Sequence, residues 1–490
     1  MSKASTFTGQ ITQLGLRLLH KLATYPLILT LLYIALCAEN KAISQENGRK
    51  PNIVLILADD LGYGDLGSYG QTKILTPNLD RLTAAGVRFT QCYAGSTVCA
   101  PSRCTLMTGL HTGHCRVRGN GGSPKGNLPL QPGDTCVAEI LKKAGYATAL
   151  IGKWGLGEEG SVGVPNKKGF DYFYGYLNQT HAHNYYPDFL YRNEEKVPIP
   201  ANVQLANHKG VAAKRAVYAP DLLLKEALGF VEANKNRRFF LYFSTTAPHA
   251  NNERTRFEKN GNEVPADEWY SKEAWPQPEK DKAAMITRLD RDVGTLLAKL
   301  RELGLEKNTV VFFTSDNGPH KEGGNDPAFF HSSGLFRGIK RSLADGGIRM
   351  PMIVRWPGVV KPGTVSDLVW AFWDFLPTAA ELAGTQPPSG LNGVTIVPTL
   401  TGKGVQKTHE FLYWEFHEGG SKQAVRYGKW KALKATPSAK LELYDVVADP
   451  HEDKNVAGQN VAVVAKIEEY LKTARTESKH WPLKEPGKKK

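Results

Sequence analysis

The stretch NIVLILADD (residues 52–60) is an apolar run that ends at a pair of acids. Three further segments have the same form, an apolar run followed by polar residues: ATALIGKWG (147–155), RFFLYFSTTAPH (238–249) and NTVVFFTSDNG (308–318). Continuous runs of Val, Ile, Leu and Phe are typical of strands in a sheet that is covered on both faces. The four segments therefore predict strands of one buried sheet.

Helical patterns separate these strands. In TPNLDRLTAAGVRF (76–89), Thr76 is typical of a helix N-cap, Pro77 of a first turn and Gly86 of a helix end. Residues 281–303 predict a long amphipathic helix that stops before a glycine. The alternation of strands and helices predicts an α/β fold with a large mixed, mostly parallel sheet flanked by helices.

Polar residues at the ends of these strands predict one shared site, because ligands of such sheets bind beyond the carboxyl ends of the strands. The residues are Asp59, Asp60, Lys153, His249, Asp316 and Asn317. Three carboxylates and an amide favour a hard cation such as Ca²⁺ or Mg²⁺ over zinc. Taken singly, the acid pair could cap a helix or turn, DNG could be a turn and the histidine could be structural. Their joint occurrence favours a site.

Two basic residues suit an anion beside that cation. Arg103 offers a fixed fork of donors and Lys153 a compact positive charge. Together with a divalent ion, they predict a pocket for a sulfate or phosphate ester.

The segment TVCAPSRCTLMTG (97–109) contains two closely spaced cysteines. Cys99 is either a chemical reagent or a structural thiol, as a small buried side chain or as a disulfide partner of Cys104. The other cysteines that follow the N-terminal segment are interpreted as structural, with their pairing open: Cys92, Cys104, Cys115 and Cys136.

The N-terminal residues 1–38 carry three basic residues, no acids and the apolar stretch PLILTLLYIALCA (26–38). This pattern predicts a cleaved secretory signal peptide followed by a linker over 39–50, with an uncleaved membrane anchor as the alternative. Cleavage would leave no stable membrane span in the mature chain. We therefore expect an exported protein, in a periplasmic, secreted or lysosome-like compartment.

The chain has 490 residues, a formal net charge of +14 and 41% hydrophobic residues, as expected for a globular protein. A basic balance suits anionic substrates or surfaces. The sequence has no zinc-ligand array, no RNA-binding aromatic motif and no dense basic helix, so nucleic acid is not the expected partner.

The C-terminal part differs from residues 51–402 in its predicted pattern of secondary structure. Segments 410–416, 422–434 and 441–457 predict short strands with turns, and 461–477 predicts a helix. Residues 403–490 are thus expected to form a small α+β subdomain with an antiparallel sheet.

Several blocks, in order, resemble the sulfatase family, whose signature cysteine is converted to formylglycine. The blocks are PNIVLILADDLGYGDLGSYG (51–70), CAPSR (99–103) with TLMTG (105–109), GKWGLG (152–157), APH (247–249), SDNG (315–318) and LFRGIKRSLADGGIRMP (335–351). The resemblance runs from about residue 51 to the C-terminus. It implies an alkaline-phosphatase-like fold for residues 51–402 and a catalytic function there.

The resemblance also implies roles for individual residues. Asp59, Asp60, Asp316, Asn317 and the modified Cys99 would bind one calcium ion. Arg103 would hold the formylglycine, Lys153 and Lys340 would contact the sulfate, and His249, helped by Lys340, would protonate the departing alcohol. The hydrated aldehyde offers one hydroxyl to attack sulfur and a second to release the sulfate afterwards. A maturation enzyme would generate the formylglycine.

One position departs from many relatives, which carry a histidine two residues after the lysine of GKW. This chain has Gly155 there. His181 and His183, in NQTHAHNYYP (178–187), are candidate substitutes or substrate contacts.

The combined reading is an arylsulfatase-type sulfuric ester hydrolase that acts on aryl or carbohydrate sulfate esters, including sulfated polysaccharides. The aromatic segment NYYPDFLYRN (184–193) could face sugar rings or could simply pack. Two alternatives are a phosphomonoester or phosphonate-ester hydrolase on the same fold, and a non-catalytic binder of sulfated glycans.

Overall fold

The computed structural model describes residues 50–123, 126–266 and 269–487. The expected signal peptide and all of the linker except Lys50 lie outside these residues. From Pro51 onwards the chain forms one compact unit. Within the described residues, no helix has the length and apolar content that a bilayer crossing requires.

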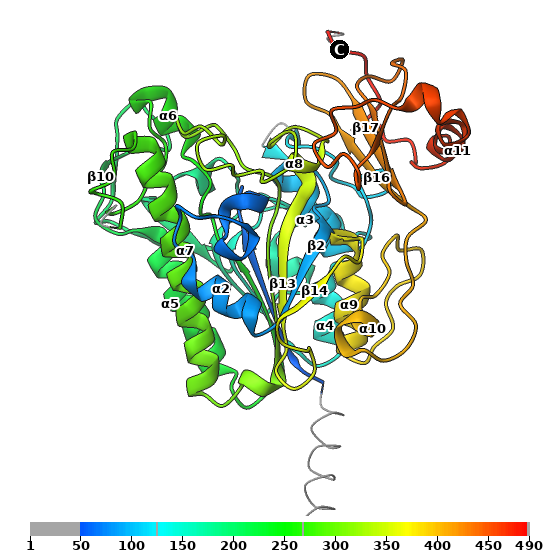
Figure 1. Cartoon of the computed structure of the whole chain (residues 1–490). Helices are drawn as coiled ribbons and strands as arrows, with labels where there is room; N and C mark the ends of the chain where they lie inside the picture. The colour runs from blue at the N-terminus through cyan, green and yellow to red at the C-terminus, as the bar shows by residue number, and fades with distance from the viewer. Residues whose placement is uncertain (1–49, 124–125, 267–268, 488–490) are drawn as a thin grey trace, which may run out of the picture. The chain divides into compact units, whose positions relative to one another are not determined.

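A single large sheet forms the centre of this unit (Figure 1). Its strand order is β14-β2-β13-β12-β1-β11-β5-β6-β7-β8, and β15 pairs with β2. The five central strands, from β12 to β6, run parallel, whereas β13, β7 and β8 pair antiparallel to their neighbours. The sheet is therefore mixed and mostly parallel at its centre, as predicted.

The bounds of the sheet strands follow the apolar runs of the sequence. They are β1 Asn52–Ala58, β2 Val87–Tyr93, β5 Ala147–Lys153, β6 Tyr172–Tyr176, β7 Phe189–Arg192, β8 Glu195–Pro198, β11 Phe239–Ser244, β12 Thr309–Ser315, β13 Arg349–Arg355, β14 Thr364–Ser366 and β15 Trp370–Ala371. Every residue of β1, β5, β11 and β12 is buried. Burial on both faces explains why these runs show no alternation of polar and apolar residues.

Helices cover both faces of the sheet (Figure 1). One apolar cluster joins the side chains of Val54 and Ile56 to α2 (Pro77–Ala84), α5 (Ala219–Ala233) and α7 (Gln277–Glu302). The other joins the alternate β1 side chains to α3 (Cys99–Thr108), α4 (Val137–Lys143) and α9 (Phe375–Leu382). The strand ends are therefore held from two sides by packed helices.

Shorter elements complete the main body. They are the hairpins β3 (Gly122–Ser123) with β4 (Gly126–Asn127) and β9 (Val203–Gln204) with β10 (Ala212–Lys214), and the helices α6 (Asn252–Glu258), α8 (Asp345–Ile348) and α10 (Val397–Thr401).

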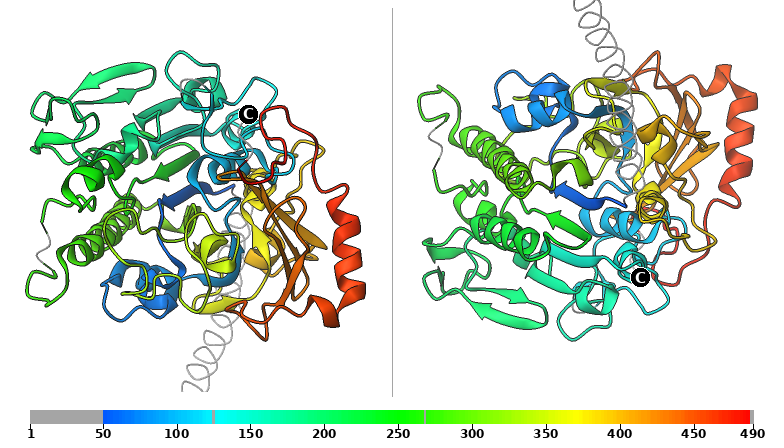
Figure 2. Two further views of the ribbon diagram at one scale, coloured as in Figure 1. Left: turned by 90° about the horizontal axis from the view of Figure 1, so that it is seen from above. Right: turned by 90° about the horizontal axis from the view of Figure 1, so that it is seen from below.

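A second sheet of four antiparallel strands follows, in the order β16-β17-β18-β19. Its strands are Phe411–Phe416, Lys422–Tyr427, Trp430–Lys434 and Glu442–Asp445, and α11 (Val461–Leu471) packs on them. Figure 2 shows these elements, orange to red, on the opposite side of the molecule from α5 and α7. The antiparallel sheet and its helix are as predicted; the domain boundary at residue 402 stays a prediction.

The helix predicted for residues 461–477 ends earlier, at Leu471. Beyond it, the Arg475 guanidinium donates to the buried carboxylate of Glu415 at 2.8 Å. A helix that continued past Leu471 would carry Arg475 in another direction and lose this bond. The tertiary contact therefore overrides the local pattern.

Candidate active site

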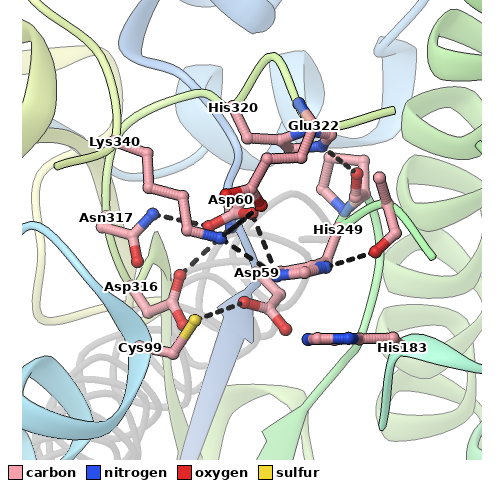
Figure 3. A network of polar contacts seen from close by, with 12 residues as sticks. Asp59, Asp60, Cys99, His183, His249, Asp316, Asn317, His320, Glu322 and Lys340 are labelled. Atoms are coloured by element: carbon pink, nitrogen blue, oxygen red, sulfur yellow. Dashed lines mark hydrogen bonds and ion pairs between the residues drawn. The ribbon is translucent and has the colours of Figure 1, made fainter. Parts of the chain in front are cut away.

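The ends of β1 and β12 bring four polar side chains together (Figure 3). The backbone N–H of Asp60 donates to Asp316 Oδ1 at 3.1 Å, and Asn317 Nδ2 donates to Asp60 Oδ1 at 2.6 Å. Asp60 adopts a φ of 65°, in the left-handed region. Because β1 and β12 are adjacent and parallel, residues that are more than 250 positions apart in the sequence meet here.

Cys99 reaches this cluster from α3, of which it is the first residue. Its Sγ lies 3.6 Å from Asp59 Oδ1. Burial raises the pKa of the Cys99 thiol well above its ordinary value, so the side chain is a neutral thiol and not a thiolate nucleophile. The five cysteines of the described residues are all buried and form no disulfide.

Arg103 lies one turn further along α3 and connects three elements. Its Nη2 and Nε donate to Asp316 Oδ2 at 2.8 and 3.1 Å, and its Nη1 donates to the carbonyl of Lys153 at 2.9 Å and to the hydroxyl of Ser244. The guanidinium is fully buried. It therefore fixes α3, and Cys99 with it, against the ends of β5, β11 and β12.

Lys153, the last residue of β5, points its ammonium group at Asp59, with 2.6 Å between Nζ and Oδ2. Burial alone would raise the pKa of Asp59, but the charges of Lys153 and Arg103 outweigh it and lower that pKa. Asp59 is thus a carboxylate at neutral pH.

Lys340 and His249 form the opposite wall of the cluster. Lys340 Nζ lies 2.8 Å from Asp60 Oδ2, 3.0 Å from His249 Nε2 and 3.0 Å from Glu322 Oε2. The His249 Nδ1 lies 2.6 Å from the carbonyl of Ala250. Burial, together with the nearby Lys340 charge, lowers the pKa of His249 well below its ordinary value. The neutral ring therefore donates from Nδ1 to this carbonyl and accepts a hydrogen bond from Lys340 at Nε2.

The acidic residues of this cluster suit a hard cation. Asn317 Oδ1 is buried and has no hydrogen-bond partner among the described residues. Burial and the charge of Asp59 raise the pKa of Asp316 to about 7, in spite of its bond to Arg103. Crowded carboxylate oxygens with a free amide oxygen are a donor set that Ca²⁺ accepts. The site thus fits a divalent ion, and ligand atoms of Asp59, Asp60, Cys99 and His249 lie within 4.8 Å of one another.

The cluster opens into a cavity of about 280 Å³. Its lining consists of Cys99, Asn120, Gly121, Gly126, Asn127, Glu158, Asn178, Gln179, Thr180, His183, His249, Asn252, Lys340 and Arg341. A larger cavity, of about 680 Å³, is lined by none of the predicted site residues. The chemistry of the side chains, and not the size of the cavity, identifies the site.

The two histidines of NQTHAHNYYP lie in different surroundings. His183 lines the cavity, stacks on His249 with 4.6 Å between ring centroids and contacts Glu253 Oε2 at 2.9 Å. His181 packs between the rings of Tyr176 and Phe189 and does not line the cavity. Of the pair, only His183 is in a position to meet a substrate there.

The tyrosines of the aromatic segment 184–193 pack inside the protein. Tyr185 and Tyr186 are buried and stack on or near the ring of Tyr218. None of its residues lines the cavity. The structure therefore supports packing, the second of the two interpretations of this segment.

Sequence reasoning missed several residues of the site. Glu322 holds both Lys340 and Arg341, while Lys282 donates to the carbonyl of Pro248 at 2.9 Å and lies 2.8 Å from His320. Ser244 bridges Arg103 and the end of β5. Ser244 directly ends an apolar run and could have been found by that signal; Glu322 and Lys282 follow no pattern in the sequence.

Comparison with known proteins agrees with this geometry. The sequence model of the sulfatase family matches residues 51–385, and that of the C-terminal part of N-sulphoglucosamine sulphohydrolase matches residues 333–478. Arylsulfatase A of Bos taurus is 35% identical over 431 residues, which cover 82% of this chain and 77% of the relative.

Two further comparisons extend over nearly the full length of the known protein. The N-acetylgalactosamine-6-O-sulfatase of Bacteroides thetaiotaomicron is 31% identical over 510 residues, covering 89% of this chain and 96% of the relative. The crystal structure of Ps i-CgsB in complex with k-i-k-neocarrahexaose superposes with a TM-score of 0.75 at 28% identity, covering 89% of this chain and 95% of that one. On these matches, and with the cysteine, the acids and the basic residues in one buried cluster, the chain belongs to the sulfatase family.

Proposed function

We propose that this sulfuric ester hydrolase is calcium-dependent, uses formylglycine at position 99 and acts on a carbohydrate sulfate ester. The observation that carries the proposal is the 3.6 Å contact of Cys99 Sγ with Asp59, inside a cluster that also contains Asp316 and Lys153. A cysteine far from the acids would have excluded it.

In this proposal Asp59, Asp60, Asp316 and Asn317 hold the calcium ion together with the modified residue 99. The buried, unpaired Oδ1 of Asn317 supports that assignment. The ion supplies positive charge next to the sulfate oxygens.

The neutral thiol of Cys99 is a poor nucleophile, which supports its conversion to formylglycine. Once formed, the hydrated aldehyde would offer one hydroxyl to attack sulfur as the alcohol oxygen leaves, and deprotonation of the second hydroxyl would then expel the sulfate and restore the aldehyde. Arg103 keeps residue 99 in place through its bonds to Asp316 and to the carbonyl of Lys153.

Lys153 and Lys340 hold the sulfate oxygens by charge. Burial alone would lower the pKa of Lys340, but the charges of Asp60 and Glu322 outweigh it and raise that pKa well above its ordinary value. Both ammonium groups therefore stay charged at working pH, and preorganised charges of this kind stabilise a transition state without reorganising.

His249 and Lys340 move the proton that the departing alkoxide needs. Lys340 Nζ lies 3.0 Å from His249 Nε2, and both residues line the cavity. The Lys340–His249 pair gives a proton to the leaving oxygen and is reprotonated from solvent before the next turnover.

The proposed substrate class follows from related proteins as well as from the cavity. One relative is named for N-acetylgalactosamine 6-O-sulfate hydrolysis, and one structural neighbour was solved with k-i-k-neocarrahexaose. The signal-like segment at residues 1–38 supports export before the protein meets such a substrate.

The test is to produce the protein together with a maturation enzyme and to measure both the peptide that contains residue 99 and the turnover. We expect this peptide to be lighter than encoded by the change from thiol to aldehyde, and p-nitrophenyl sulfate to be hydrolysed. The Cys99→Ala variant should show neither property, while it retains the melting temperature of the parent.

Full activity with an unmodified thiol would defeat the proposed nucleophile. Faster hydrolysis of p-nitrophenyl phosphate than of the sulfate would favour the phosphate-ester alternative. Binding of sulfated glycans that survives Cys99→Ala, with no sulfate release by the parent, would favour the non-catalytic binder.

A further inference from the structure

Most of the residues that line the cavity in front of Cys99 have polar side chains. Within the described residues, its lining contains no phenylalanine, tyrosine, tryptophan, leucine, isoleucine or valine. An aryl leaving group there would cover polar groups of the lining without offering them hydrogen bonds, which costs free energy. The surroundings suit a leaving group that is itself covered by hydrogen-bonding groups.

Gln179 lines this cavity and carries an amide group whose nitrogen lies next to Gly155. Its Nε2 is buried and has no hydrogen-bond partner among the described residues. A Cβ at Gly155 would lie 2.9 Å from this Nε2 and 3.1 Å from Gln179 Cγ. The Gln179 side chain therefore occupies the space that a side chain at position 155 would fill. It packs against the chain two residues after Lys153.

Asn252 contributes a second amide group to this lining. Its Oδ1 is buried and unpaired among the described residues, and the residue lines the same cavity. The N-cap of α6 is the preceding residue, Asn251, whose side chain accepts from the N–H of Arg254. Capping therefore does not use the Asn252 amide. Its neighbour Glu253 is bonded to His183, which stacks on His249 and so fixes the start of α6 beside the reacting groups.

Gln179 and Asn252 thus place two amide groups that make no hydrogen bond to the described residues in the lining of one cavity, where a ligand can bond to them. An amide group has both a hydrogen-bond donor and an acceptor, and a hydroxyl group can bond to either of them. Gln179 comes from a turn and Asn252 from the start of α6, so each amide can bond to a separate hydroxyl group.

Charge at the same cavity favours neutral hydroxyls over a second anion. The guanidinium of Arg341 is already paired with Glu322 and Glu418. Glu158, also in the lining, accepts a hydrogen bond from Asn178 at 2.9 Å and carries a carboxyl group that can accept from a hydroxyl but repels a sulfate.

We propose that Gln179 and Asn252 recognise hydroxyl groups of the sugar that bears the sulfate, and thereby select a carbohydrate ester over an aryl ester. This inference rests on the proposed function of the site. The residues that bind sulfate are separate from these two amides, so the two levels can be tested independently.

The experiment compares kinetics on two kinds of substrate with the calcium-loaded, matured protein. The substrates are p-nitrophenyl sulfate and a set of sulfated monosaccharides that includes N-acetylgalactosamine 6-sulfate. The variants are Gln179→Met and Asn252→Leu, which keep the approximate volume and remove the amide. Gln459→Met, at an exposed position of the C-terminal part, is the matched control.

We expect each variant to lose ten- to hundredfold in kcat/KM on the sugar that the parent cleaves best, because a hydroxyl is left without its partner. On p-nitrophenyl sulfate the change should stay below about threefold, and the control should match the parent on both. An equal loss on both substrates, or no loss on the sugar, would overturn the inference.

Two further outcomes distinguish a failure of this inference from a failure of the proposed hydrolase function. A parent that hydrolyses p-nitrophenyl sulfate but none of the sulfated monosaccharides overturns the inference and leaves the hydrolase in place. A matured parent that releases sulfate from no substrate overturns both.

A binding measurement provides a readout other than turnover. The Cys99→Ala protein should bind the same sulfated monosaccharide, measured by calorimetry, and adding Gln179→Met should weaken this binding tenfold or more. Unchanged binding in the double variant would contradict direct recognition by Gln179.

Discussion

Asp316 is the residue in which most of the interactions of the site meet. It accepts from Arg103 and from the backbone N–H of Asp60, and its pKa is raised by burial and by the charge of Asp59. An acid in such surroundings is stabilised by a cation on its free side. Its contribution can therefore be tested by removing only its charge.

Asp316→Asn is expected to reduce both bound metal and turnover. The asparagine oxygen can still accept from Arg103 but no longer from the N–H of Asp60 at the same time, and the loss of one anionic ligand weakens the calcium site. We expect metal content after dialysis to fall below half and p-nitrophenyl sulfate turnover to fall by about 100-fold or more.

The measurements are elemental analysis of the purified protein and initial rates with added Ca²⁺. Asp367→Asn, at an exposed aspartate, is the control and should match the parent. Full turnover by Asp316→Asn, or by the parent after complete chelation, would refute the calcium role.

At the scale of single residues, the sequence identified those that follow a buried strand directly. Asp59, Lys153 and Asp316 are predictable because the strand fixes both their position and their direction. Gln179 and Asn252 were not predicted, since their place at the cavity depends on loops whose path no local pattern encodes.

At the scale of elements, the close pairing of β5 with β11 and β6 controls the position of Lys153. Gly152 adopts a φ of 117°, and a Cβ there would lie 1.8 Å from the carbonyl oxygen of Ser244. The same serine accepts from Arg103 and donates to the Lys153 carbonyl at 2.7 Å. Only a glycine allows the two strands to approach this closely at the site.

Gly152→Ala is therefore expected to destabilise the protein and to impair turnover together. The added methyl group must displace β11 or β5, and the φ value is strained for alanine. We expect a free energy of unfolding lower by about 2 kcal/mol or more and turnover lower by at least tenfold.

Thermal and urea unfolding, with rates on p-nitrophenyl sulfate, test this prediction. Gly133→Ala is the control, because a Cβ at Gly133 meets no atom within 4 Å. If Gly152→Ala kept parental stability and activity, the close contact of the two strands could not be what positions Lys153.

At the scale of the whole molecule, a buried ionic cluster ties the C-terminal sheet to the main body. Glu415, in β16, accepts from Arg118 at 3.0 Å and from Arg475 at 2.8 Å, and contacts His417 at 3.0 Å. Burial alone would raise the pKa of Glu415, but its hydrogen bond with His417 and the charges of the three basic groups lower it to about 2.

This shift makes part of the stability depend on pH. Because the folded pKa of Glu415 lies below the ordinary value of 4.5, the ionised form stabilises the fold. The contribution, about 3 kcal/mol, is present above pH 4.5 and is lost as the pH falls towards 2.

Glu415→Gln should therefore lower the free energy of unfolding by about 3 kcal/mol at pH 7, and by much less at pH 3, where the parent has lost part of the same contribution. Urea unfolding at both pH values measures the difference. Glu468→Gln, at an exposed position of α11, should have no effect at either pH. A deficit that is equal at pH 7 and pH 3 would show that the charge of Glu415 is not responsible.

The sequence by itself determined four central strands of the sheet, two of the covering helices and a set of polar residues at the strand ends. A strand that is buried on both faces needs an unbroken apolar run, and polar residues follow where the strand ends at the site. Both features are visible in the local sequence of NIVLILADD and its three counterparts.

Only the tertiary structure decided which polar residues share the cavity and which are packed away. His183 faces the site while His181 is enclosed by Tyr176 and Phe189, although the two are only two residues apart. The partnership of Gln179 with Gly155 and that of Glu415 with Arg118 likewise join distant or differently directed segments. Such contacts are set by how the loops and sheets pack in three dimensions, and no periodicity along the chain records them.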